Sequence, residues 1–439
     1  MPKIKRSQYC IARQCLAKHG ATLKAPYQLE GVKWLLEHER KFKTGALLCD
    51  EMGLGKTIQT IALILGSSLK NTLLVLPASL IRQWEEQINK FASDMITVYT
   101  HHGTSRVFET EFDKHSKLVV ITSYNLIIND NSKFSSVEWD RIILDECHYM
   151  RNSKSIIFDS LMKMKAQRKL GLTGTPIQNY MSDLVTLFIF LDYEKSTIYV
   201  EMERLIRLHI LRRTKQNIKE FDEKLDLPPI NVVSKLIRIS KEERAHTDII
   251  ASYEFYPFET ILRKKQSAIS LQLLENGLAK KFKKQPKILK NTSTKLRFIA
   301  KKALEHCEKK DKVIIFTTFA YEVDYLQNVF QSRKIKVNHI SGNVPLDSRK
   351  KIMDSTDTQV LIVQIVCGGT GLNLQQYNVA LFTSPTWNPS LEEQAIGRLH
   401  RIGQTKPVTI YRVLCHRTID KKIDTVQQIK RKMINQYIK

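Results

Sequence analysis

The sequence contains few of the residues that mark unstructured or fibrous chains. Only 16 glycines and 12 prolines occur in 439 residues, and 42% of the residues are hydrophobic. This composition excludes collagen, low-complexity chains and intrinsic disorder. The longest apolar runs, at residues 184–191 and 360–367, are far shorter than the roughly 20 residues that a membrane-spanning helix needs. We therefore expect a folded chain with no membrane span and no membrane partner.

Cysteine is also scarce. The seven cysteines are an odd number scattered over a long chain, which favours reduced thiols over a disulfide framework. Cys10, Cys15 and His19 are residue types that bind zinc, but no second Cys/His pair follows at ligand spacing, so we interpret them as ordinary helix-face residues. No apolar segment follows the basic N-terminus, which argues against a secretory signal. We expect a soluble, intracellular protein of the nucleus or cytoplasm.

Acidic residues are outnumbered. There are 44 Asp and Glu against 70 Lys and Arg, a formal net charge of +26, which suits a polyanion such as nucleic acid or an anionic surface. Many basic residues lie in a stretch from about residue 235 to 310 that has almost no Gly or Pro and is predicted to be helical. Either they form a solvated helix face or they contact phosphates, and charge alone does not choose. They are Arg263, Lys264, Lys265, Lys280, Lys281, Lys283, Lys284, Lys287, Lys290, Lys295, Arg297, Lys301 and Lys302.

Short β-branched segments alternate with amphipathic helical segments in both halves of the chain. This alternation is typical of parallel sheets covered by helices, so the sequence predicts two α/β units. No internal repeat is visible, which argues against a solenoid. The predicted strands are residues 46–49, 72–76, 117–122, 141–144 and 169–173, then 312–316, 336–340, 359–366, 378–382 and 408–414.

A glycine-rich segment follows the first predicted strand and opens a helix at residues 58–65. Such a turn lets backbone N–H groups surround phosphate oxygens, and the helix points its positive end at them. Lys56 would reach the β- and γ-phosphates, and the Thr57 hydroxyl would bind Mg²⁺. The strict P-loop pattern has glycine where Asp50 stands, so this is a variant. The segment is Asp50, Glu51, Met52, Gly53, Leu54, Gly55, Lys56 and Thr57.

Two adjacent carboxylates end the strand predicted at residues 141–144. At the C-terminal end of a strand the two carboxylates can have separate roles in hydrolysis. Asp145 would bind Mg²⁺, and Glu146 would position or deprotonate the attacking water. Taken alone, Asp-Glu after a strand is a weak signal, but its place after a phosphate loop makes it a strong one.

Two arginines near the end of the second unit are the remaining catalytic candidates. Arg398 and Arg401 are three residues apart and would share a helix face, so both guanidinium groups could enter one anionic cleft. There they would stabilise charge on a transferring phosphoryl group. A surface pair bound to local carboxylates is the alternative.

The order of these motifs resembles the Swi/Snf-type branch of helicase superfamily two, a DExH-box family, from about Pro26 to the C-terminus. Cys147 replaces the commoner small residue of the family, and no acidic residue precedes Trp387. The matching segments are 26–28 with Gly31 and Trp34 (adenine recognition), 50–57, 76–80 with Trp84, 122–124, 145–148, 173–176 with 178–179, 211–215, 227–229, 368–374 and 394–404.

The resemblance implies an α/β fold with two tandem RecA-like parallel-sheet lobes and a helical insertion between them. ATP with Mg²⁺ would bind between the lobes, contacting Gln28, residues 50–57 and Gly371, with Arg398 and Arg401 reaching in from the later lobe. The implied boundaries are an N-terminal extension at 1–24, the first, ATP-binding lobe at 25–225, a basic helical connection at 226–293 and the C-terminal lobe at 294–439.

The activity that the resemblance implies is ATP-driven translocation along double-stranded DNA, which displaces or remodels bound proteins. A strand-separating DNA or RNA helicase, an ATPase that assists transcript release from a polymerase, and a catalytically silent nucleic-acid-binding module are the alternatives. The intact candidates Lys56, Asp145, Glu146, Arg398 and Arg401 argue against the last. A compact motor without reader domains suits a large DNA virus or a mobile bacterial system, with targeting supplied by protein partners.

Overall fold

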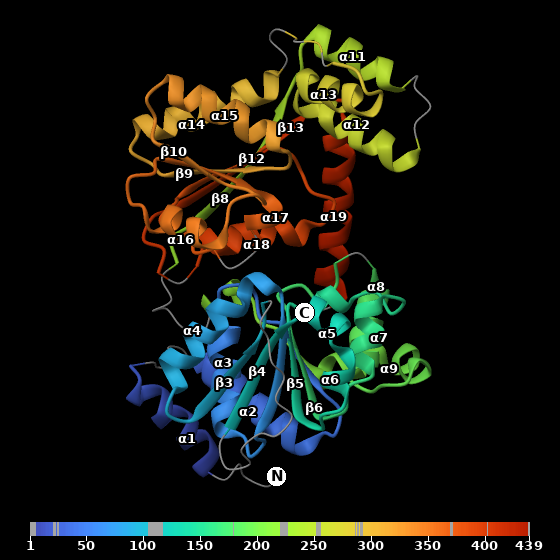
Figure 1. Ribbon diagram of the computed structural model, residues 1–439, viewed down its shortest axis with the longest axis vertical. Coiled ribbons are helices and arrows are strands. Elements are labelled where there is room, and N and C mark those ends of the chain that lie inside the picture. Colours follow the sequence, from blue (N-terminus) through green and yellow to red (C-terminus); the bar gives the residue numbers. More distant parts are fainter. Residues whose placement is uncertain are drawn as a thin grey trace. The chain divides into compact units, whose positions relative to one another are not determined.

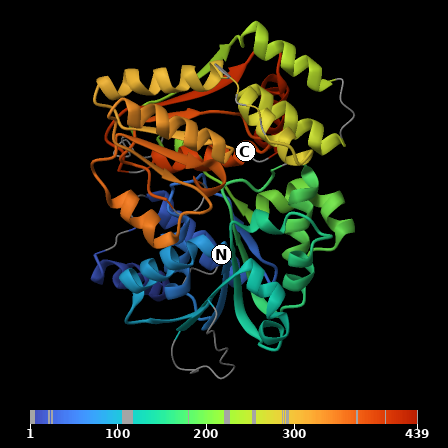
Figure 2. The same ribbon diagram turned by 45° about the horizontal axis from the view of Figure 1, so that its top comes forward.

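The computed structural model describes residues 6–437 apart from 21–22, 24–25, 104–116, 179, 220–226, 252–255, 286, 288, 290–292, 369–371 and 402. The chain forms two compact units, the first mainly from residues 1–226 and the second from residues 227–433. Each unit is a parallel sheet with helices on both faces (Figures 1 and 2). Among the helices in the described ranges, none has both the length and the apolar content that a membrane span requires. The predicted α/β class with two parallel-sheet lobes is confirmed.

The first unit contains a seven-stranded sheet with the order β3-β4-β2-β5-β6-β1-β7, and every neighbouring pair is parallel. Its strands are β1 (Ala46–Leu48), β2 (Asn71–Leu76), β3 (Ile96–His101), β4 (Lys117–Ser123), β5 (Trp139–Asp145), β6 (Ala166–Leu172) and β7 (Ile210–Leu211).

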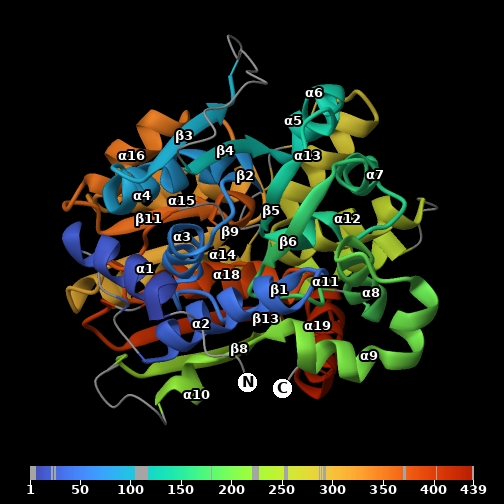
Figure 3. The same cartoon turned by 90° about the horizontal axis from the view of Figure 1, so that it is seen from below.

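Helices cover both faces of this sheet. Figure 3 shows α1 to α4 on one side of the strands and α5 to α9 on the other. The helices are α1 (Arg6–Lys18), α2 (Pro26–Lys41), α3 (Lys56–Gly66), α4 (Ile81–Ala92), α5 (Tyr124–Asn129), α6 (Asn131–Ser135), α7 (Ile156–Met162), α8 (Met181–Phe190), α9 (Lys195–His209) and α10 (Lys215–Lys219), with short 3₁₀ helices η1 (Ala78–Leu80) and η2 (Cys147–Met150).

The apolar strands explain why the sheet is covered on both faces. Side chains of a strand alternate between faces, and in β5 Ile142 and Leu144 join one core cluster while Ile143 joins the other. All three are fully buried. A continuous apolar run therefore specifies a central strand, with helices on each side.

The second unit repeats this plan with a six-stranded parallel sheet of order β10-β11-β9-β12-β13-β8. Its strands are β8 (Ile230–Ile237), β9 (Val313–Thr317), β10 (Val337–Ile340), β11 (Val360–Gln364), β12 (Val379–Phe382) and β13 (Val408–Cys415).

In Figure 1, α14 and α15 cover one face of this sheet, and α17 and α18 lie on the other. Three further helices, α11 to α13, form a group beside the sheet (Figures 1 and 2). The helices of the unit are α11 (Lys241–Ala251), α12 (Pro257–Ile269), α13 (Leu271–Lys281), α14 (Thr294–Glu308), α15 (Ala320–Ser332), α16 (Leu346–Asp354), α17 (Ile365–Gly368), α18 (Pro389–Leu399) and α19 (Ile419–Tyr437).

All ten predicted strands are present, with bounds that shift by a few residues. The sequence missed β3, β7 and β8. The segment 226–293, predicted as a helical connection, contains α11, α12 and α13 but also β8, which pairs with β13 along its whole length. The structure therefore adds a strand of the second sheet to a region that the sequence described as helical.

Candidate nucleotide-binding site

The glycine-rich segment lies where β1 ends and α3 begins, at the C-terminal edge of the first sheet. Gly53 and Gly55 have φ values of 88° and 79°, a left-handed conformation that glycine adopts without strain. Gly55 precedes α3, and no side chain caps the helix. The helix N-terminus, with its positive dipole end, is therefore oriented as in an anion-binding site.

Helix α2 holds this loop from the side. The Tyr27 hydroxyl and the Gln28 amide donate to the Leu54 carbonyl at 3.0 and 3.2 Å. A Cβ atom on Gly55 would lie 2.6 Å from the Gln28 Nε2 atom, so no larger residue fits there without a shift. Gln28, which the sequence predicts as an adenine contact, is thus in contact with the phosphate loop; its adenine contact stays a prediction.

Lys56 and Asp50 close the loop. The Lys56 ammonium donates to the Asp50 carbonyl at 2.7 Å. The Asp50 carboxylate is completely buried and accepts hydrogen bonds from Gln59 Nε2 at 3.1 Å and from Arg213 Nε at 2.9 Å. The aspartate that departs from the strict P-loop pattern is therefore the buried half of an ion pair.

Arg213 is the residue whose role the sequence missed. Besides Asp50, it donates to Gln59 Oε1 at 2.8 Å and to the Tyr27 carbonyl, and its guanidinium lies 5.2 Å from the centre of the Tyr27 ring. It joins α2, α3 and the phosphate loop to the chain that follows β7. Asp50 is the sequence feature that could have indicated this role. A carboxylate in an apolar strand-to-helix turn needs a buried cation beside it.

Replacing Arg213 with alanine is expected to destabilise the first unit by about 3 to 5 kcal/mol, since it leaves the buried Asp50 carboxylate without its cation. Thermal unfolding of the purified variant measures this. Arg82→Ala is the matched control, because its pair with Glu86 is exposed on α4 and surface pairs contribute at most about 1 kcal/mol. Equal Tm values for the two variants would show that the contacts of Arg213 with Asp50, Gln59 and Tyr27 do not stabilise the first unit.

Asp145 lies at the end of β5 with both carboxylate oxygens bonded. Trp84 Nε1 donates to Oδ2 at 2.7 Å, and the Glu146 amide donates to Oδ1 at 2.9 Å. The Tyr124 hydroxyl holds the Asp145 carbonyl at 2.9 Å. The sequence placed Trp84 in a motif but gave it no contact; the structure shows that it orients the predicted Mg²⁺ ligand.

Burial, followed by the charge of Glu146, raises the pKa of Asp145 to about 6, while Lys56 acts in the opposite direction. The positive charge of Lys56 is thus close enough to act on Asp145, so the phosphate loop and the carboxylate pair belong to one site. The buried Asp145 carboxylate and the half-buried Glu146 carboxylate repel each other, and a divalent cation would offset their charge. Thr57, half-buried in the first turn of α3, and Asp145 are the residues that would hold Mg²⁺.

Glu146 has a strained backbone. Its φ of 50° lies in the left-handed region, which is uncommon outside glycine. At Glu146 the chain leaves β5 and enters η2. The Glu146 Oε2 atom lies 3.2 Å from His148 Nδ1. Strain of this kind is concentrated at active sites.

The loop after β6 packs against both motifs. His148 Nδ1 and the Thr173 hydroxyl are 3.2 Å apart, and Arg151 donates to Gln178 Oε1 at 2.6 Å. A Cβ atom on Gly174 would lie 2.8 Å from Met52 Cγ of the phosphate loop. The structure therefore brings the three motifs of the first unit together at one edge of the sheet. Asn179 lies outside the described residues.

The raised pKa of Asp145 predicts a pH-dependent stability. Above about pH 6 the carboxylate is charged and its burial opposes folding; below about pH 4 it is protonated in both states and the penalty disappears. Because asparagine does not titrate, Asp145→Asn without Mg²⁺ is expected to gain roughly 3 kcal/mol relative to wild type between pH 4 and pH 8, whatever its amide N–H₂ costs beside the Trp84 or Glu146 N–H donor at both pH values. Differential scanning calorimetry at pH 8 and pH 4 checks this. A stability difference between variant and wild type that is the same at both pH values would contradict it.

The second unit holds the two predicted arginines, but not on one helix face. Helix α18 contains Arg398 and ends at Leu399, so Arg401 lies beyond it and the shared-face prediction is wrong. Burial and the charge of Arg398 nevertheless lower the pKa of Arg401, so the two charges are neighbours. The chain leaves the helix at His400, whose φ and ψ of −92° and 80° are not helical, and the His400 ring contacts the Pro228 carbonyl at 2.8 Å.

The catalytic and nucleotide-binding roles of Lys56, Glu146, Arg398 and Arg401 remain predictions. Gly371, the predicted nucleotide contact of the second unit, lies outside the described residues.

Comparison with known proteins gives two family matches. A model described as the SNF2-related domain matches residues 27–288, and one described as the helicase conserved C-terminal domain matches residues 294–403. The first match covers the phosphate loop and the Asp145-Glu146 pair, and the second covers Arg398 and Arg401.

Several proteins are similar to this chain over most of its length. An uncharacterized ATP-dependent helicase of Mycoplasma pneumoniae is 30% identical and covers 93% of the chain and 42% of its own length. The ATP-dependent DNA helicase DDM1 of Arabidopsis thaliana is 28% identical over 93% of the chain and 61% of its own length. A solved structure of the SWI2/SNF2 ATPase core of Sulfolobus solfataricus in complex with dsDNA is 25% identical, with a TM-score of 0.43 over 93% of this chain and 91% of that one.

The chain spans less than half the length of the first relatives it matches, between 41% and 48%. The relatives named above are cellular proteins, so they lend no support to the viral origin considered from the sequence.

Proposed function

The chain belongs to the SNF2-related family of ATP hydrolases in helicase superfamily two, and from this we propose that it hydrolyses ATP to move along double-stranded DNA and to displace or remodel bound proteins. The observation that carries the proposal is the arrangement of Lys56, Asp145 and Glu146 at one edge of the first sheet, braced by Trp84 and Arg213. This is the residue set that phosphoryl transfer to water needs.

In the proposed mechanism Lys56 leaves the Asp50 carbonyl and binds the β- and γ-phosphates. Glu146 orients the attacking water and accepts its proton. Mg²⁺ bound by Thr57 and Asp145 would neutralise charge on the phosphate oxygens. Arg398 and Arg401 of the second unit would stabilise the charge that develops on the transferred group.

Binding to DNA would rest on contacts with backbone phosphates, which give weak sequence preference and a steep salt dependence. The relative from Arabidopsis thaliana is named a DNA helicase, and the net charge of +26 fits a DNA partner. Closure of the two lobes on ATP and opening after hydrolysis would move the chain along the duplex.

The basic residues of the stretch from about 235 to 310 have two different environments in the structure: some are buried and others are exposed. Arg263 is buried against Glu259 and Gln266, at 3.0 and 2.9 Å. Lys295 is buried in an ion pair with Asp420 at 2.6 Å. These two residues stabilise the fold and are not available to DNA. The exposed residues include a group at the end of α13, in which Lys281 also pairs with Glu259: Lys280, Lys281, Lys283 and Lys284.

Replacing the four lysines at the end of α13 with glutamine is expected to flatten the slope of log affinity against log salt for duplex DNA. Each lost phosphate contact reduces the slope by about 0.9, so the largest expected change is roughly 3 to 4. Fluorescence anisotropy at several salt concentrations measures it. Lys336→Gln, an exposed lysine paired with Asp357, is the control. An unchanged slope would show that these four lysines form a solvated surface and do not contact DNA.

Strand separation is the second candidate activity, because the relatives from Mycoplasma pneumoniae and Arabidopsis thaliana are named helicases. Two substrates separate the candidates: a forked duplex, and a blunt duplex carrying a triplex-forming third strand. A translocase displaces the third strand and leaves the fork paired. Unwinding of the fork at a comparable rate would favour the helicase.

A further inference from the structure

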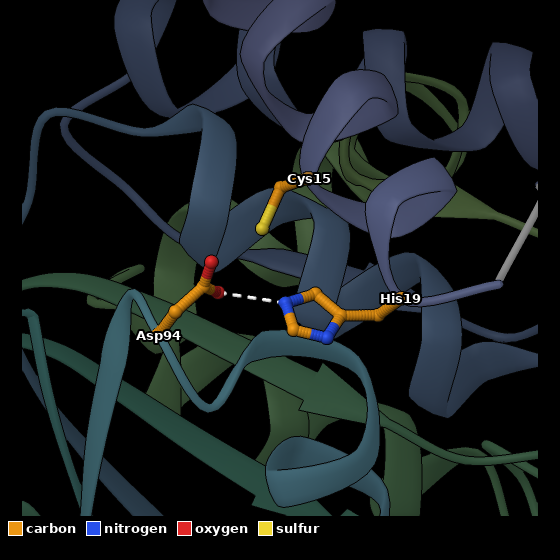
Figure 4. A group of neighbouring side chains, drawn as sticks. All are labelled: Cys15, His19 and Asp94. Atoms are coloured by element: carbon orange, nitrogen blue, oxygen red, sulfur yellow. Dashed lines mark hydrogen bonds and ion pairs between the residues drawn. The ribbon is translucent and has the colours of Figure 1, made fainter.

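A cluster of three metal-binding side chains lies away from the nucleotide site, at the C-terminal end of α1. The Cys15 thiol, the His19 imidazole and the Asp94 carboxylate have donor atoms that all lie within 4.8 Å of one another. Figure 4 shows the three side chains pointing toward a common centre. Cys15 and His19 come from the end of α1, and Asp94 from the turn between α4 and β3.

The local structure explains the convergence. The His19 amide donates to the Cys15 carbonyl at 3.4 Å, which continues the helical turn and places both side chains on one face. Ala12, Cys15 and Leu16 are buried in the core of the first unit and fix the position of α1. Cys15 therefore lies at the inner edge of the cluster, while the Asp94 side chain is 36% exposed and opens the cluster to solvent.

We propose that Cys15, His19 and Asp94 bind a zinc ion, with water in the fourth position. Sulfur, imidazole and carboxylate are the ligand types of zinc, and three protein ligands plus water is a common arrangement. The ligand atoms of a tetrahedral zinc site lie about 3.5 Å apart, so no separation here, all being within 4.8 Å, needs to shorten by more than about 1.3 Å. The ion would tie the end of α1 to the turn before β3.

The present contacts are compatible with metal entry. His19 Nε2 and Asp94 Oδ1 are 2.7 Å apart, and Lys18 Nζ donates to Asp94 Oδ2 at 2.6 Å. A metal ion would replace the bond between His19 and Asp94 and leave the Lys18 pair on the other oxygen. Burial and the Asp94 charge raise the pKa of the Cys15 thiol, so metal binding would release its proton.

The sequence pointed to Cys10, Cys15 and His19 and found no further ligand at suitable spacing. The structure supplies Asp94, which is distant in sequence, and leaves Cys10 exposed and outside the cluster. Cys10→Ser is therefore the matched control for Cys15→Ser.

Cobalt(II) is the probe, because a thiolate ligand gives it a charge-transfer absorption. After metal removal with a chelator, the whole chain is expected to bind one Co²⁺ ion and to show this absorption. One Zn²⁺ ion should then displace the cobalt and abolish the absorption. Cys15→Ser should abolish the absorption and Asp94→Asn should weaken binding at least about 10-fold, since loss of a group that merely supports a ligand already costs about 10- to 100-fold. Cys10→Ser should keep both the absorption and the affinity.

Absence of the thiolate absorption in the wild-type chain, or its persistence in Cys15→Ser, would overturn the proposal. Circular dichroism confirms that the variants are folded, and Asp94→Asn, on the surface, provides a second readout if Cys15→Ser does not fold. Neither ATP nor DNA enters the experiment, so its result is independent of the proposed function.

Discussion

Glu146→Gln is expected to reduce the rate of ATP hydrolysis by about 10² to 10⁴-fold, the usual contribution of a positioned general base. Glutamine has nearly the same shape as glutamate but cannot accept the proton of the attacking water. Nucleotide and DNA affinity should stay near the wild-type values, because Lys56 and the phosphate loop are unchanged. Steady-state hydrolysis, with binding of a fluorescent ATP analogue, measures both quantities.

Glu201→Gln is the control for this variant. Glu201 lies on α9 and pairs with Arg204 on the surface, so the same chemical change is expected to leave hydrolysis intact. A Glu146→Gln enzyme that keeps a rate near that of wild type would refute the assignment of the base.

Arg401→Ala is expected to lower the hydrolysis rate by about 10³-fold or more while ATP binding persists. An arginine that stabilises the transferring phosphoryl group typically contributes roughly 10³ to 10⁵ in rate. Burial and then the charge of Arg398 lower the pKa of Arg401, so an anion bound beside the two cations would relieve their repulsion. Single-turnover hydrolysis with excess enzyme separates this effect from ATP affinity.

Arg333→Ala provides the comparison for Arg401→Ala, because Arg333 is exposed at the end of α15. Its rate should match that of wild type. If Arg401→Ala hydrolyses ATP as fast as Arg333→Ala, the second unit supplies no catalytic arginine at this position.

The central strands of both sheets could be predicted because burial on two faces demands continuous apolar runs. The three missed strands, β3, β7 and β8, all lie at sheet edges, where this signal is weak, whereas β10, the fourth edge strand, was predicted. Most side chains of β3 and β8 are exposed or half-buried, and β8 pairs with β13, far along the chain. For β3 and β8, the pairing with a neighbouring strand identifies the strand where the residue pattern does not.

The same distinction applies to the site. The phosphate loop and the Asp145-Glu146 pair are each contiguous in sequence, so their positions at the ends of β1 and β5 could be predicted from residue types and spacing. The contact between Trp84 and Asp145 joins residues 61 apart, and that between Arg213 and Asp50 joins residues 163 apart. No local pattern encodes these contacts.

Charge was the least informative signal. Lys295 looked like part of a basic surface, yet it is buried with Asp420, 125 residues away. A run of charges in sequence does not distinguish a phosphate-binding surface from buried ion pairs, because the partner carboxylates lie elsewhere in the chain.

Movement along duplex DNA is tested by the rate of ATP hydrolysis by the purified chain with duplex DNA, single-stranded DNA, RNA or no nucleic acid, at several salt concentrations. A translocase of duplex DNA is expected to be stimulated most by the duplex, with stimulation that falls as salt rises. Equal rates with and without DNA would show that hydrolysis is not coupled to DNA and would rule out the translocase.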